Sequence, residues 1–257
     1  VSASPGAPGV LVADMTAAVA LSNAAVKRGG AIVTHEIALS VSPGSWFGLI
    51  GANGSGKTSL LRALGGRLPF AGGSCLLDGR ELAGDRAGRA RHFGFAPPPD
   101  TLPDMLRVRE VLELVSGSGE AYRARLEPLW QALGLDGLME RWIGECSAGM
   151  RQRAAIATAF AGEHAAVILD EPFNWLDPVA AFDLRRALRA MVDDGLTLIT
   201  ALHDLGTLAA ACDTGVMLAD GRCAMELSRE MLAAARRDPL AFESATIDRL
   251  RSRTGGR

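Results

Sequence analysis

One glycine-rich segment, Gly51-Ala-Asn-Gly-Ser-Gly-Lys-Thr58, has the residue types and spacing of a phosphate-binding loop, G-x-x-x-x-G-K-[ST]. Glycines let successive backbone N–H groups turn inward around phosphate oxygens, and a following helix adds the partial positive charge of its N-terminus. The lysine of this pattern reaches the β- and γ-phosphates of a nucleotide, and the hydroxyl after it ligates Mg²⁺. We therefore expect Lys57 and Thr58 to take these two roles.

Lysine is rare in this chain, which makes its position in the loop informative. Only two of the 27 basic residues are lysines, Lys27 and Lys57. A lysine retained among arginines indicates a need for a compact point charge. The residues of this segment that we expect to contact the nucleotide are Gly51, Asn53, Gly54, Ser55, Gly56, Lys57, Thr58 and Ser59.

Two adjacent carboxylates, Asp170 and Glu171, follow the apolar run Ala-Ala-Val-Ile-Leu at residues 165–169. Neighbouring residues of a strand point to opposite sides, so the two side chains cannot share one role. Asp170 is placed to hold Mg²⁺ through water, and Glu171 to polarise an attacking water molecule.

Short apolar strands alternate with helices around these motifs, which predicts a parallel sheet covered on both faces. The first two strands are joined by a Gly-Gly turn. We expect strands at residues 18–26, 32–41, 46–50, 165–169, 196–201 and 215–219, and helices at 57–64, about 147–161, 178–192 and about 205–211.

The middle of the chain has a different pattern. Prolines at residues 96–104 predict a rigid loop that is neither helix nor central strand. Between about 105 and 145 the apolar residues have helical spacing, which predicts a small helical subdomain.

Composition limits the class of protein. The chain has 257 residues, 48% of them hydrophobic and 22% charged, with a net charge of −2, as is typical of a soluble globular protein. The near-neutral charge argues against a nucleic-acid binder that depends on a basic face. The four cysteines form no C-x-x-C pair and are expected to be small buried hydrophobes. We expect no signal peptide and no membrane span.

The sequence resembles the ATP-binding subunit of ABC transporters, and three further segments support this resemblance. Cys146-Ser-Ala-Gly-Met150, followed by Arg-Gln-Arg, is similar to the family signature LSGGQ and its helix. Asn174-Trp-Leu-Asp177 is similar to the D-loop, and His203 lies where the family has its switch histidine. The similarity runs from about Ala18 to Arg222.

The resemblance implies an α/β fold: a P-loop NTPase core with a mostly parallel sheet, a small antiparallel β subdomain and an inserted helical subdomain. It implies ATP and Mg²⁺ as cofactors, with Thr58 and Asp170 at the metal. Lys57, Glu171 and His203 are then catalytic. By the same resemblance, the nucleotide also contacts Ser147, Gly149 and Asp177, and Ser147 and Gly149 bind the γ-phosphate held by the opposite subunit.

Two positions depart from the family pattern. Pro98 stands where the family has a glutamine that leads into the helical subdomain, and proline offers no side-chain donor or acceptor. Arg28 stands where an aromatic residue stacks on adenine, and a guanidinium plane can also stack on a base. The replacements Ala148 and Cys146 within the signature are mild.

The expected function is ATP-driven transport through separate membrane-spanning permease subunits, export more than import, by a nucleotide-dependent homodimer or heterodimer on the inner face of the cell membrane. The alternatives are a catalytically weak or regulatory subunit of a heterodimer and a soluble ATPase of the same fold that does not serve transport. The expected domains are a tail at 1–16, the ATPase domain at 17–227 with a helical subdomain at about 100–160, and a helical extension with seven arginines at 228–257.

Overall fold

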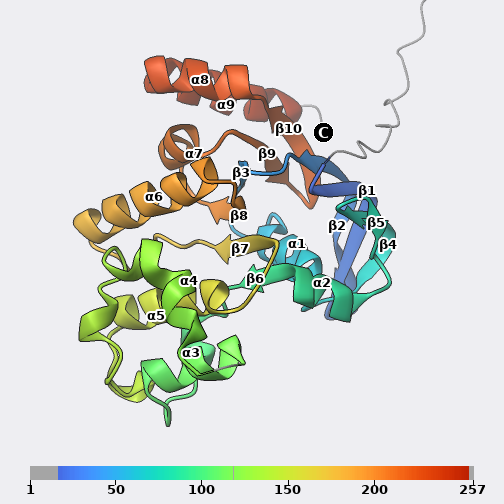
Figure 1. Ribbon diagram of the computed structural model, residues 1–257. Helices are drawn as coiled ribbons and strands as arrows, with labels where there is room; N and C mark the ends of the chain where they lie inside the picture. The colour runs from blue at the N-terminus through green and yellow to red at the C-terminus, as the bar shows by residue number, and fades with distance from the viewer. Residues whose placement is uncertain (1–16, 118, 255–257) are drawn as a thin grey trace, which may run out of the picture.

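The computed structural model describes residues 17–117 and 119–254, with side chains through residue 246. Two sheets organise these residues (Figure 1). The antiparallel sheet has the order β2-β1-β4-β5, with β1 (Val19–Arg28), β2 (Ala31–Val41), β4 (Phe70–Leu77) and β5 (Arg80–Glu81). The larger sheet has the order β10-β9-β3-β8-β7-β6 and consists of β3 (Trp46–Ile50), β6 (Phe93–Phe95), β7 (Ala166–Asp170), β8 (Thr197–Leu202), β9 (Thr214–Ala219) and β10 (Arg222–Leu227).

The larger sheet is parallel except at one edge, where β10 pairs antiparallel with β9. All residues of β3 and β8 are buried, as expected for strands covered on both faces. In β3, Trp46 and Ile50 pack into the core shared with the helical segment, whereas Phe47 and Leu49 pack into the core beneath the antiparallel sheet. Because successive side chains of β3 point to opposite faces of the sheet, this one strand contributes residues to both hydrophobic cores.

Helices cover both faces of the larger sheet and form a separate group at one side (Figure 1). α3, α4 and α5 contact one another in that group. Among the described residues, none of the helices combines the length and the apolar character that crossing a membrane requires. The helices are α1 (Lys57–Leu64), α2 (Arg86–His92), α3 (Val108–Ser116), α4 (Ala121–Trp130), α5 (Ala148–Ala161), α6 (Pro178–Asp193), α7 (Leu205–Ala211), α8 (Arg229–Arg237) and α9 (Pro239–Thr254).

The strands and helices expected from the apolar pattern are present, most with ends shifted by a residue or two. The expectation that residues 96–104 contain no helix is wrong, because Pro99–Thr101 forms one 3-10 turn. Proline is compatible with a first helical turn, because the N–H groups of that turn have no partner within the helix and the missing N–H of proline is not needed. Between 105 and 145 the pattern overestimates helix: α3 and α4 are followed by two 3-10 turns, Leu135–Gly137 and Ile143–Glu145. The tail at 1–16 lies outside the described residues.

The apolar pattern does not reveal α2, because this helix buries an arginine. Arg89 is fully buried and donates hydrogen bonds to the backbone carbonyls of Ala63, Leu68, Leu82 and Ala83. A helix that packs through a charged side chain leaves no apolar stripe in the sequence.

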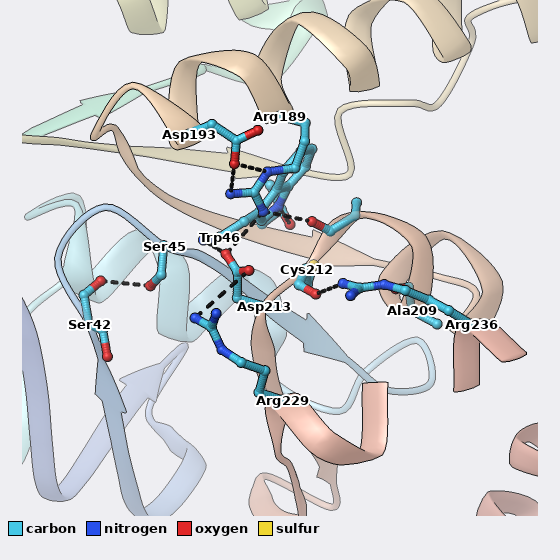
Figure 2. A network of polar contacts seen from close by, with 12 residues as sticks. Ser42, Ser45, Trp46, Arg189, Asp193, Ala209, Cys212, Asp213, Arg229 and Arg236 are labelled. Carbon is cyan, nitrogen blue, oxygen red and sulfur yellow. Dashed lines mark hydrogen bonds and ion pairs between the residues drawn. The ribbon is translucent and has the colours of Figure 1, made fainter. Parts of the chain in front are cut away.

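An aspartate that directly precedes β9, Asp213, fixes the beginning of β3 (Figure 2). Asp213 Oδ2 accepts a hydrogen bond from the Trp46 backbone N–H at 2.9 Å and pairs with Arg189 of α6 at 3.0 Å. Burial raises the pKa of Asp213, but the bonds from Trp46 and Arg189 outweigh it and hold this pKa below its ordinary value. The strand that leads into the glycine-rich segment is therefore anchored at its start.

The four cysteines are free thiols. Cys75, Cys146 and Cys212 are buried, as expected, and Cys223 is half-buried. Burial raises the pKa of Cys75 to about 12, so this thiol stays protonated at neutral pH and acts as a small apolar side chain.

Candidate functional site

The glycine-rich segment connects the end of β3 to the start of α1. Gly56 has a φ of 102°, and a Cβ at this position would lie 2.7 Å from Thr34, so a side chain does not fit. Lys57 is the first residue of α1, and its Nζ donates to the carbonyls of Gly51 at 2.7 Å and Ala52 at 3.3 Å. The Oγ of Ser55 is buried without a partner in the described residues. The loop thus encloses one ammonium group and one hydroxyl available to a ligand.

A cavity of about 320 Å³ opens beside this loop. Its lining includes Arg28 and Val33 from the antiparallel sheet, Glu171, and the loop and helix residues Asn53, Gly54, Ser55, Gly56, Lys57, Thr58 and Ser59. All the nucleotide contacts expected from the loop line this cavity except Gly51, whose carbonyl holds Lys57. Arg28, expected to stack on the base, is exposed and lines this cavity.

Asp170, the last residue of β7, lies next to the start of α1. Its carboxylate accepts a hydrogen bond from the Thr58 hydroxyl. Burial raises the pKa of Asp170 despite this bond, and Oδ1 is buried without a partner in the described residues. The half-buried hydroxyl of Thr58 and the unpartnered carboxylate oxygen of Asp170 are the kind of oxygen donors that Mg²⁺ prefers, so the residues present fit this ion.

Glu171 has a φ of 55°, a left-handed conformation that is unusual for a residue other than glycine. Its Oε2 lies 2.6 Å from Nε2 of His203, which directly follows β8, and accepts a hydrogen bond from Asn174 Nδ2 at 2.9 Å. The structure therefore brings together the two residues expected to act on water and the γ-phosphate. Asn174, which the sequence placed only in the D-loop, is a direct partner of Glu171.

A second cavity, of about 270 Å³, adjoins the carboxylates of Asp170 and Glu171. It shares Thr58 and Glu171 with the first cavity and is also lined by Asp170 and Arg62. Pro98 lines this cavity together with Pro97 and Pro99. An apolar proline side chain therefore stands in the lining at the position where the family has glutamine. The sequence placed Arg62 only within the expected helix at 57–64. Its position in the lining of the second cavity is seen only in the structure.

No residue of the signature-like segment 146–150 lines either cavity, although Gln152 of the same helix lines the second one. Ser147 caps α5 by accepting a hydrogen bond from Met150 N–H at 3.3 Å, and both Ser147 and Ala148 are exposed. Neither Ser147 nor Gly149 lines the cavity of the phosphate loop. The segment presents a helix N-terminus, which is attractive to an anion, on the surface.

Asp177 is also engaged elsewhere. Its Oδ1 caps α6 by accepting from the N–H groups of Val179 at 3.0 Å and Ala180 at 2.9 Å, and its Oδ2 pairs with Arg153 at 3.3 Å. Within this chain it is a helix cap, and the structure does not bring it to the phosphate loop.

Comparison with known proteins gives one family. The model of the family "ABC transporter" matches residues 34–174. The hemin import ATP-binding protein HmuV of Pseudomonas putida is 36% identical over 207 residues, which cover 76% of this chain and 81% of that protein. Mouse ATP-binding cassette sub-family A member 7 is 35% identical over 192 residues, or 73% of this chain, but the chain spans only 9% of that protein's length.

Solved structures have the same fold. An ATP-binding subunit of an ABC transporter superposes with a TM-score of 0.74 at 26% identity and covers 86% of this chain and 93% of its own. The cassette MJ0796 bound to ADP and Pi superposes with a TM-score of 0.71 at 21% identity, which supports the fold. The family match covers more than half of the chain and includes both the phosphate loop and the paired carboxylates. This chain therefore belongs to the ABC transporter family, as one of its ATP-binding, ATP-hydrolysing cassettes.

Proposed function

We propose that this cassette powers transport through separate membrane-spanning permease subunits, and that the direction is export. The observation that carries the catalytic part is the convergence of Lys57, Thr58 and Glu171 on one cavity, with Asp170 and His203 in contact with them. The export direction rests on the pattern from Ser147 to Arg153, which resembles export-type subunits.

The proposed mechanism assigns one role to each group. Lys57 and the N-terminus of α1 hold the phosphates, and His203 contacts the γ-phosphate. Glu171 accepts a hydrogen bond from the attacking water and orients it, while Asn174 restricts the carboxylate through Oε2. Mg²⁺, when bound by Thr58 and Asp170, neutralises charge that develops on the phosphates.

The exposed end of α5 supports a nucleotide-dependent dimer. Ser147 and Gly149 lie outside the cavity of their own phosphate loop, and an exposed helix N-terminus binds anions. We propose that they receive the γ-phosphate held by a second ATP-binding subunit, either another copy of this chain or a different one, and that Asp177 lies at the same interface.

The proposed permease surface lies on the helical subdomain. Met105, Leu114 and Trp142 are 83%, 71% and 40% exposed around α3, and exposed large apolar side chains in one region favour a protein contact. We propose the division into an ATPase domain at 17–227, with this subdomain at about 100–160, and a helical extension from 228. The assembly would lie on the inner face of the membrane.

One observation favours a second candidate, a catalytically weak subunit of a heterodimer. Pro98 supplies no side-chain donor or acceptor to the cavity beside Asp170. A weak subunit would bind ATP and release little phosphate, even when its partner subunits are present.

The test uses membranes of the source organism and measures phosphate release with Mg²⁺ or with EDTA. The unmodified chain should hydrolyse ATP only with Mg²⁺ and should retain an identified polytopic membrane protein after detergent extraction. The double variant Leu114→Asp with Met105→Asp, which alters only exposed residues, should lose that protein and keep ATP binding. Retention of ribosomes or nucleic acid instead of a polytopic protein would contradict the transport role.

A further inference from the structure

One face of α5 packs against the loop that follows β7, from Glu171 to Asp177. Residues 149, 152 and 153 lie on one side of the helix, since residues three and four apart are neighbours on its surface. A Cβ on Gly149 would lie 2.7 Å from the carbonyl of Trp175, so the helix and this loop approach closely. Arg153 pairs with Asp177 at 3.3 Å. The helix that begins at Ser147 therefore contacts the loop from Glu171 to Asp177 at several points.

The central contact of this face is made by Gln152. Its side chain is buried, with 5% of its surface exposed. Its Nε2 donates to the carbonyl of Glu171 at 3.3 Å and to the carbonyl of Pro172 at 3.1 Å. A buried amide that donates to two successive carbonyls fixes the orientation of the peptide between them.

Fixing this peptide matters because Glu171 is in a strained conformation. Its φ of 55° is unfavourable for a residue with a Cβ and persists only where surrounding contacts impose it. The Glu171 N–H donates to the Ala201 carbonyl at 3.1 Å, which fixes one end of the residue, and Gln152 fixes the other. These two anchors constrain the backbone of Glu171 and thus the direction in which its side chain leaves the chain, while Asn174 and His203 contact the carboxylate itself.

We propose that Gln152 is a positioning residue for the catalytic carboxylate of Glu171, and that it makes the signature end of α5 and Glu171 move as one body. The inference rests on the proposed role of Glu171. Contact of Ser147 with an opposite subunit is then transmitted through α5 to the carboxylate of this chain's own site. Gln152 lines the second cavity, and its hydrogen bonds go to the backbone carbonyls of Glu171 and Pro172, so it would act through the backbone of Glu171.

The test is Gln152→Met, which keeps the length of the side chain and removes both donated hydrogen bonds. A catalytic group displaced by about 1 Å loses roughly a hundredfold in rate, so we expect turnover to fall between tenfold and a hundredfold. The dissociation constant and KM for ATP should stay within about twofold, because the phosphate loop is untouched. Gln152→Leu, which has no donor at any pH, should behave in the same way.

The matched control is Thr158→Val on the same helix. Thr158 is buried, and its Oγ1 donates within its own helix, to the Ala155 carbonyl at 2.7 Å. This variant should keep the turnover of the unmodified chain. Circular dichroism and urea unfolding on every variant give the folded fraction, by which each rate is divided.

A double variant separates positioning from general damage. If Gln152 acts through Glu171, Gln152→Met should cause no further loss in the Glu171→Gln background, because the two changes remove the same function. Additive losses, or a folded Gln152→Met protein with normal turnover, would overturn the inference. Full turnover in Glu171→Gln alone would instead refute the assignment of Glu171, so the two failures are distinguishable.

Discussion

The phosphate-loop region and the N-terminal end of α5 differ in how complete they are within one chain. Around the loop, Lys57 is buried and bonded to the loop's own carbonyls, and Thr58 contacts Asp170. At α5, Ser147 is exposed and bonds only its own helix in the structure described. Both are helix N-terminal ends, and the first lines a cavity together with other residues of its own chain.

We propose that the anion-binding chemistry of a helix N-terminus is used twice in this chain, at an inner end (the start of α1, at Lys57) and at an outer end (the start of α5, at Ser147). In this proposal the inner end holds the nucleotide within the chain's own cavity, and the outer end binds an anion that another molecule brings, which is the physical basis for the proposed dimer. Variants at each end should therefore affect different measurements.

The largest effect is expected from the inner end. Lys57→Ala removes the ammonium group that the loop holds among its carbonyls, so ATP binding should weaken and turnover should fall at least about a hundredfold. The matched control is Lys27→Ala, which removes the only other lysine, an exposed one on β1. Isothermal titration and phosphate release measure both. Equal effects of the two variants would mean that the loop does not bind the phosphates.

A change at the outer end should separate binding from turnover. Ser147→Asp keeps a cap for α5 but places a negative charge where the γ-phosphate is proposed to arrive, so turnover should fall roughly a hundredfold at unchanged ATP affinity of the monomer. Ser228 caps α8 in the same way through Met231 N–H, and Ser228→Asp is the control. A loss of monomer affinity in Ser147→Asp would break the distinction between the two ends.

A smaller effect is expected where the base should lie. Stacking of a base is worth about 1 to 3 kcal/mol, so Arg28→Ala should raise the dissociation constant for ATP about fivefold or more. Binding of inorganic tripolyphosphate should not change, and Arg28→Tyr should restore affinity for ATP. Unchanged ATP affinity in Arg28→Ala would show that the loop alone determines binding.

The smallest effect on turnover is expected at the anchor of β3. Asp213→Asn weakens the bonds to Trp46 and Arg189 and should lower the free energy of unfolding by about 1 to 3 kcal/mol at pH 7. The folded pKa of Asp213 lies below its ordinary value, so the ionised carboxylate stabilises the fold above pH about 4, and this stabilisation is lost as pH falls through the folded pKa. Urea unfolding should therefore show a difference between variant and unmodified chain that shrinks at low pH.

Much of the fold could be predicted because it depends on local patterns. Continuous apolar runs identified β3, β7 and β8, and the glycine-lysine pattern identified the start of α1 at Lys57. The pattern missed β4, where adjacent glycines weaken the strand signal, and α2, which packs through Arg89. It also missed β5, β6 and β10, which are short or lie at the sheet edge.

The sequence supplies the candidate residues of the site, whereas the contacts between them come from the structure. The contact between Glu171 and His203 depends on the order of β7 and β8 in the sheet, which the residues alone do not specify. The hydrogen bonds of Gln152 to the loop after β7 and the strained φ of Glu171 have no counterpart in residue type. They arise from the packing of α5 against that loop.

The most direct test of the proposal that the N-terminal ends of α1 and α5 bind ATP from two subunits is the solution mass of Glu171→Gln with and without Mg-ATP. Blocking hydrolysis should trap the ATP-bound state, so the account predicts that the mass doubles when ATP binds and returns to that of a monomer when ATP is removed. Adding Ser147→Asp to this variant should abolish the doubling while ATP binding persists. An ATP-bound monomer of Glu171→Gln would contradict a homodimer and require a different subunit to complete the site, and doubling that survives Ser147→Asp would contradict the role of the α5 end.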